Sequence, residues 1–169
     1  MLPFVHFDLP VLLQQVVSRH FPDMEATIST SFMPASFSRT ESLASVRVRG
    51  RTAEIRIREI LNRSDTPRKV IEFILSHEAL HVRVRLREIG GRLAKHAPEF
   101  WEAETRLLPE RSIVWAWLYA ALWSRIKFDK KTVAVMVKRG WQNASDHPFP
   151  TLEDVRAITE ADAEIVRCI

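Results

Sequence analysis

The chain has 169 residues and a mass of 19.6 kDa, which fits one compact domain with its own core, with or without a short extension. Its 46% hydrophobic and 27% charged residues exclude a disordered, collagen-like or coiled-coil protein. The single cysteine, Cys168, excludes an internal disulfide and any zinc site built from CxxC pairs. A metal ion would therefore need histidine and carboxylate ligands.

The chain is basic, with a formal net charge of +4 and an isoelectric point near 9.6. This charge permits an anionic partner such as DNA but does not require one. The N-terminal segment lacks the basic residues of a signal peptide, and the longest uncharged apolar run, Ile113–Trp123, is shorter than the ~20 residues that cross a bilayer. We therefore expect a cytoplasmic protein with no membrane partner.

A helix and a strand are predicted at the start of the chain. Asp8 and Pro10 begin an apolar periodic pattern that ends near His20, before Pro22, as is typical of a helix. Residues Glu25–Phe32 alternate between apolar and polar side chains and predict a strand. A loop rich in serine, threonine and proline follows over residues 33–43.

A β-hairpin is predicted on both sides of Gly50, with aliphatic side chains on one face and arginines on the other. Glu54 and Glu59 would partly neutralise the arginine face, so a solvated sheet surface is the simpler interpretation. The alternative is an anion-binding strip that contacts nucleic acid through Arg47, Arg49, Arg56 and Arg58.

A central helix should begin at Pro67 and continue to about Ile89, where Gly90 and Gly91 supply a helix stop. The remaining predicted elements are helices over Glu99–Leu108 and Arg111–Lys127, a short strand over Thr132–Val137 and a last helix from near Leu152.

The central helix contains the pattern HExxH, formed by His77, Glu78 and His81. Residues four apart stack on one helix face, so the two imidazoles can share a zinc ion while the glutamate stays close to a bound water. Helical spacing places Glu78 between Leu75 and Val82 in an apolar arc, where a carboxylate is costly without a partner or a function. The alternative is two histidines bonded to the backbone and a glutamate paired with an arginine.

A catalytic zinc usually has three protein ligands, so one more is needed. Four downstream side chains are candidates: His96, Glu99, Glu102 and Glu104. We favour His96, because it follows the two glycines and directly precedes a helix start at Pro98 that two buried aromatic residues, Phe100 and Trp101, would anchor. Glu102 is the second choice.

The motifs EIRIREILN, VIEFILSHEALH and HAPEFW, over about residues 44–108, resemble the SprT-like metallopeptidases, which include the Spartan proteases. They are also similar to the related YgjP-like metal hydrolases, whose third-histidine motif is H-x-P-x-F-W. The resemblance implies an α+β, zincin-like domain over residues 1–108, with a small antiparallel or mixed sheet packed on the HExxH helix. A mostly helical extension, residues 109–169, would pack on the same core.

The resemblance also implies a function. One Zn²⁺ per chain would be held by His77, His81 and His96, with Glu78 as general base, in a zinc-dependent metallopeptidase acting on a protein or peptide. The alternatives are a DNA-associated protein, including one that processes DNA–protein crosslinks, and a non-catalytic zinc-binding domain. Zincins align an extended substrate on an edge strand beside this helix, and residues Glu54–Ile60 are the candidate for that strand.

Overall fold

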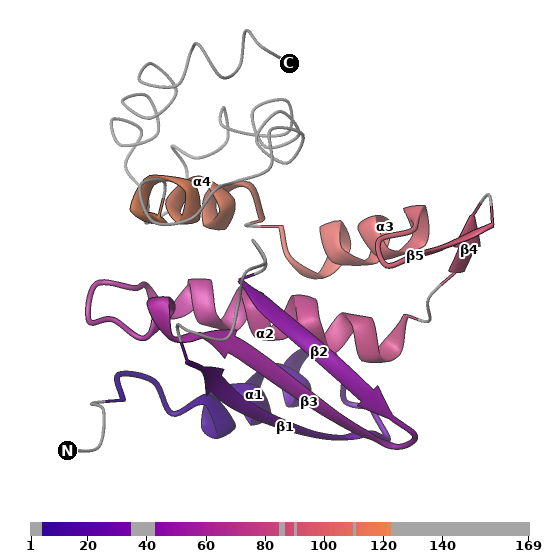
Figure 1. Cartoon of the computed structure of the whole chain (residues 1–169), viewed down its shortest axis with the longest axis horizontal. Helices are drawn as coiled ribbons and strands as arrows, with labels where there is room; N and C mark the ends of the chain where they lie inside the picture. Colours follow the sequence, from indigo (N-terminus) through magenta and orange to yellow (C-terminus); the bar gives the residue numbers. More distant parts are fainter. Residues whose placement is uncertain (1–4, 35–42, 85–86, 90, 110, 123–169) are drawn as a thin grey trace, which may run out of the picture. The chain divides into compact units, whose positions relative to one another are not determined.

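The computed structural model describes residues 5–34, 43–84, 87–89, 91–109 and 111–122 (Figure 1). The chain divides into two compact units, Met1–Leu108 and Pro109–Ile169. The first unit has an α+β fold with a small mixed sheet, as predicted. The predictions for Thr132–Val137 and for the last helix lie outside the described residues. None of the helices described here is long and apolar enough to cross a membrane.

The first helix, α1 (Leu9–His20), confirms the predicted N-terminal helix. Asp8 caps it, because its side chain accepts a hydrogen bond from the Val11 N–H at 3.1 Å. The helix buries four aliphatic side chains: Leu9, Leu12, Leu13 and Val16. It ends before Pro22, as the sequence predicts.

A three-stranded sheet follows, in the order β1 (Thr27–Met33), β3 (Thr52–Arg58) and β2 (Ala44–Arg49). Strands β2 and β3 form the predicted antiparallel hairpin, and Gly50 in its turn has a φ of 59°, a conformation that favours glycine. Strand β1 pairs with β3 in parallel. The prediction that Glu54–Ile60 forms an edge strand is therefore wrong, because β3 has a partner on each side. Among the strands that the structure describes, the edges of this sheet are β1 and β2.

One face of the sheet forms the core with α1 and α2. Three residues of β3, Ala53, Ile55 and Ile57, are at most 4% exposed. Helix α1 contacts β1, whereas α2 contacts β2 and β3 (Figure 1). The opposite face of the sheet carries polar and charged side chains. Strand β2 is consequently the sheet edge beside α2.

Helix α2 (Arg68–Arg83) follows the short 3-10 helix η2 (Glu59–Leu61) and begins after Pro67, as predicted. It ends six residues before Ile89, and Val84 already has extended backbone. Strands β4 (Arg87–Ile89) and β5 (Arg92–Ala94) form a hairpin instead. Gly91, with a φ of 76°, lies in its turn, so the predicted helix stop at the glycines is wrong.

Helix α3 (Pro98–Leu107) begins at Pro98, as predicted, and buries Phe100 and Glu104. It packs against α2. The second unit is described through α4 (Arg111–Leu122), which matches the start of the predicted helix Arg111–Lys127.

Candidate metal centre

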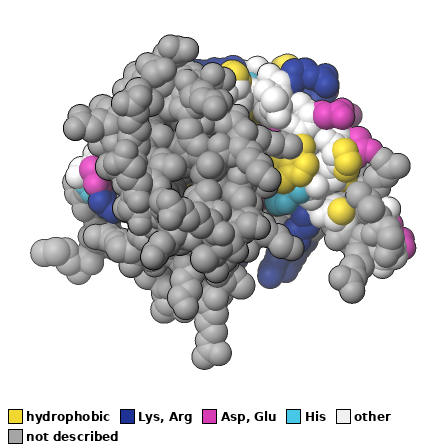
Figure 2. Space-filling model, turned by 90° about the horizontal axis from the view of Figure 1, so that it is seen from above, with side chains coloured by type: hydrophobic (Ala, Val, Ile, Leu, Met, Phe, Trp, Pro, Cys, Tyr) yellow, Lys and Arg dark blue, Asp and Glu magenta, His cyan; other side chains and the backbone are white. Residues whose placement is uncertain are grey.

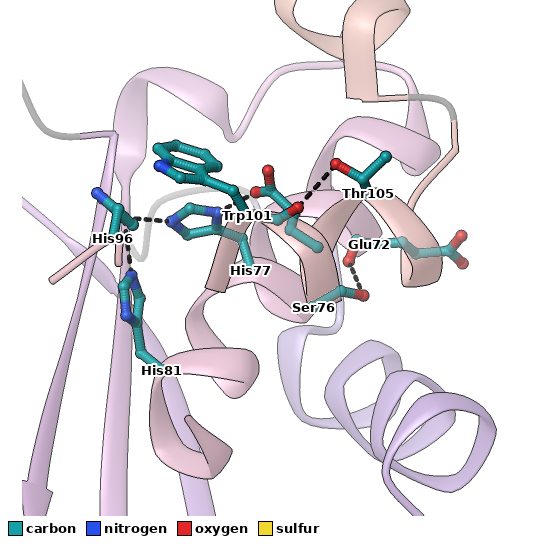
Figure 3. Close-up of polar contacts among 8 residues, drawn as sticks. Glu72, Ser76, His77, His81, His96, Trp101 and Thr105 are labelled. Carbon is teal, nitrogen blue, oxygen red and sulfur yellow. Dashed lines mark hydrogen bonds and ion pairs between the residues drawn. The ribbon is translucent and has the colours of Figure 1, made fainter. Parts of the chain in front are cut away.

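Three histidines converge at the contact between α2 and α3. His77 and His81 lie on successive turns of α2, and His96 lies between the end of β5 and the start of α3. Their rings point toward one another (Figure 3). His77 and His81 are half-buried and His96 is exposed. Figure 2 shows histidine reaching the surface of the described part between hydrophobic and basic side chains. The structure thus brings together the three residues predicted as ligands.

The distances between these rings fit one metal ion. The Nε2 atom of His96 lies 3.0 Å from His81 Nε2 and 3.3 Å from His77 Nε2. One ligand atom from each histidine lies within 4.8 Å of the other two. Two nitrogens bound tetrahedrally at about 2.0–2.1 Å from zinc are about 3.3 Å apart. The three side chains are therefore close enough to hold such an ion.

The other ring nitrogen of His77 has a carboxylate partner. His77 Nδ1 lies 2.5 Å from Glu104 Oε1, and the Glu104 side chain is fully buried. Because a carboxylate accepts, Nδ1–H of His77 donates, and Nε2, which lies 3.3 Å from His96 Nε2, is the ring nitrogen left for a metal ion. Such an arrangement orients a metal-binding histidine and fixes its tautomer.

Phe100 supports all three histidine rings from α3. It is fully buried, and its ring centroid lies 4.3 Å from His81, 4.9 Å from His96 and 5.1 Å from His77. Trp101 lies 4.9 Å from His96. The sequence predicted that both aromatics are buried, but Trp101 is only half-buried. Packing against Phe100 limits how far each imidazole can rotate.

Glu78 is buried in α2, as its place in the apolar arc predicts, and is 8% exposed. Burial raises the pKa of its carboxyl, while the charges of His77 and Lys95 oppose this increase. A raised pKa makes this carboxylate a stronger proton acceptor, which suits a general base at neutral pH.

His81 is held in its neutral form. Burial lowers its pKa to about 3, and the nearby charges of His77, His96 and Lys95 act in the same direction. A metal ion binds the neutral imidazole, so this environment keeps His81 ready to bind one at neutral pH.

The remaining predicted site residues lie outside this cluster. Glu99 and Glu102 are exposed on α3. The four arginines are on β2 and β3, where Arg47 and Arg49 are exposed, and Arg56 donates to Glu54 at 2.8 Å. From the sequence, Glu104 is a candidate ligand only, and its place beside His77 Nδ1 is not predicted. Its spacing of four residues from Phe100, which places both on one face of α3, is the signal that could have found it.

Comparisons of the chain with protein-family models, with curated proteins and with solved structures gave no match. The resemblance to SprT-like metallopeptidases rests on the motifs quoted above.

Proposed function

We propose that this protein is a zinc-dependent metallopeptidase in which His77, His81 and His96 hold the metal ion and Glu78 is the general base. The observation that carries the proposal is the convergence of three imidazole nitrogens beside a buried glutamate of the same helix. The zincin-like fold that the resemblance implies is part of the same proposal.

Hydrogen bonds alone explain the histidine cluster less well than a cation does. With His77 Nδ1 donating to Glu104, Nε2 of a neutral His77 is an acceptor. One proton on Nε2 of His96 or His81 serves the 3.0 Å contact between them and leaves the 3.3 Å contact between the Nε2 atoms of His96 and His77 without a proton of its own. A divalent cation accepts all three lone pairs at once.

The residues present suit peptide hydrolysis. A zinc ion held by three imidazoles would supply a Lewis acid that polarises a water molecule and the substrate carbonyl. Glu78 would accept the proton of the attacking water and then donate it to the leaving amine. The burial of Glu78 keeps bulk water from competing for that proton.

The substrate would lie along β2 rather than β3. Strand β2 is the sheet edge that contacts α2. An extended peptide can pair with such an edge through main-chain hydrogen bonds, which holds its scissile bond in a fixed direction.

The test compares Glu78→Gln with the wild-type protein. We expect the variant to retain one metal ion per chain and to lose cleavage of an unfolded protein substrate, as measured by elemental analysis and product formation. The matched control, Glu102→Gln, alters an exposed glutamate on α3 and should cleave normally. Cleavage by Glu78→Gln at the wild-type rate contradicts the mechanism. Metal binding without cleavage by the wild type indicates a non-catalytic zinc domain.

A further inference from the structure

Strand β1 is an outer strand of the three-stranded sheet, on the side of β3 away from β2 (Figure 1). The Thr27 N–H donates to the Arg51 carbonyl at 2.9 Å, so the main-chain groups of Thr27 point towards β3. Successive residues of a strand direct these groups to opposite sides, and those of Ile28, Thr30 and Phe32 therefore point away from β3. Within the described part of the chain, the outward groups of these three residues have no hydrogen-bond partner.

This edge of the molecule carries no charge. All residues of β1 are uncharged, and so are residues Leu9–Ser18 of α1, the helix that contacts β1, although 27% of the chain is charged. Edge strands usually carry charges or proline that prevent a further strand from adding, and β1 has neither. Two copies of a chain with a net charge of +4 can therefore meet at β1 without bringing like charges together.

The helix side of β1 borders a cavity of about 450 Å³. Apolar side chains of α1, among them Leu13 and Val17, line this cavity together with Ile28 and Thr30. Thr30 Oγ1 is buried and has no hydrogen-bond partner among the described residues. A buried hydroxyl without a partner destabilises a fold, because the unfolded chain bonds it to water. The edge thus offers an apolar recess and an unpaired hydroxyl at the same place as the outward main-chain groups.

We propose that β1 pairs antiparallel with β1 of a second copy of this chain, about a two-fold axis at Thr30. In this register Thr30 opposes its own counterpart, and Ile28 of each copy opposes Phe32 of the other. Every residue with outward main-chain groups then exchanges hydrogen bonds with another such residue. An axis at Ser29 or Ser31 would leave one of the three residues in each copy opposite a position outside β1. The inference is independent of the proposed peptidase function.

The side chains of β1 are complementary in this register. Ile28, Thr30 and Phe32 are half-buried on the helix side of the sheet. Pairing an aromatic with a β-branched side chain is favourable across strands, and it places Phe32 of one copy beside the cavity that Ile28 lines in the other. A change of the χ1 rotamer of Thr30 would let its hydroxyl bond that of its counterpart. The second copy thus supplies partners for the main chain, the recess and the hydroxyl together.

The exposed serines of β1 allow the register to be tested. Ser29 and Ser31 lie on the outer face of the sheet, and each would oppose the other across the axis, in pairs whose side chains approach closely. Within one copy, Ser29 is beside Glu54 and Ser31 is beside Arg56. A lysine at both positions therefore gains one favourable and one unfavourable neighbour, so its effect on the fold of a single copy should be small.

The experiment measures the dimerisation constant of the full chain by analytical ultracentrifugation over a range of concentrations. We expect a reversible monomer–dimer equilibrium for the wild type. Ser29→Lys/Ser31→Lys places like charges in both serine pairs and should weaken the dimer about tenfold at low salt, with a smaller effect at high salt. The matched control, Ser29→Lys/Ser31→Glu, places lysine opposite glutamate in both pairs and should dimerise at least as tightly as the wild type.

A mixing experiment tests whether the partner is a second copy. Ser29→Glu/Ser31→Glu should also dimerise weakly by itself, whereas an equimolar mixture with Ser29→Lys/Ser31→Lys should form a mixed dimer, because opposite charges then face each other. No residue of the candidate metal centre lies on β1 or α1. Unchanged zinc affinity, measured by chelator competition, therefore checks that each variant remains folded.

Three results would overturn the inference. One is a wild type that is monomeric at every concentration, including one that instead binds an alternating valine–threonine peptide at β1, since another protein's strand would then occupy the edge. The second is a dimer that Ser29→Lys/Ser31→Lys leaves intact, which places the interface elsewhere. The third is equal weakening by Ser29→Lys/Ser31→Lys and Ser29→Lys/Ser31→Glu, which excludes the register centred on Thr30.

Discussion

Glu104 Oε1 lies 2.5 Å from His77 Nδ1, closer than the ring nitrogens of the three histidines lie to one another, at 3.0 and 3.3 Å. The two residues belong to different helices, α3 and α2. Glu104 is therefore a positioning residue: it fixes the ring of one candidate ligand without lying among the ligand atoms. The packing of α3 on α2 thus contributes to the candidate metal centre in two ways, through Glu104 and through Phe100.

We expect Glu104→Gln to weaken zinc binding by about 10- to 100-fold, the usual effect of losing a carboxylate behind a metal-binding histidine. The amide oxygen still accepts from His77, but its negative charge is gone. Zinc affinity is measured by competition with a chelator at fixed pH. Glu102→Gln removes the same charge from an exposed position of α3 and should leave the affinity unchanged. Equal affinity in Glu104→Gln and the wild type would show that Glu104 does not position His77.

His96→Ala should abolish stoichiometric metal binding, because it leaves two of the three imidazoles. Elemental analysis of the purified protein should give one zinc ion per wild-type chain and much less in the variant. His6→Ala is the control, since His6 is a histidine outside the cluster. A variant that still holds one ion per chain would exclude His96 as a ligand.

The local signals of the sequence predicted several elements well. Asp8 and Pro22 bracket α1, and Pro98 begins α3. The HExxH spacing and the placement of His96 before a helix were enough to predict which histidines come together. These predictions depend on helix periodicity and on capping residues, which act within a few positions of the chain.

Two other features depend on contacts between distant residues. Strand β3 became the central strand because β1, whose Thr27 pairs with Thr52, adds to it in parallel. Alternation within a strand does not show its partners. The predicted end of α2 at the two glycines is wrong for a related reason, since adjacent glycines can either end a helix or form a hairpin turn. Here β4 and β5 pair antiparallel, so the glycines form a hairpin turn.

The metal-free protein should lose stability as the pH falls from about 6.5 towards 3. The pKa of His81 is about 3 in the folded protein and 6.5 ordinarily, so the unfolded chain takes up its proton first. The raised pKa of Glu78 acts in the opposite direction, because its protonation relieves a buried charge. Urea unfolding of the wild type and of His81→Gln over this pH range isolates the contribution of His81. The variant should lose less unfolding free energy than the wild type as the pH falls. An equal loss would contradict the assignment.

Phe100→Ala should cost about 3–5 kcal/mol of unfolding free energy, as large-to-small changes of buried aromatics do. It should also weaken zinc binding by the folded protein, more than Phe21→Ala does, since Phe100 contacts all three histidine rings. Phe21→Ala is a matched control, because Phe21 is also buried, at 1% exposed, but is not among the rings that contact His77, His81 or His96. Chemical unfolding gives the stability of each variant, and chelator competition gives the affinity. If both variants bind zinc equally well when folded, Phe100 stabilises the fold and does not hold the histidines in place.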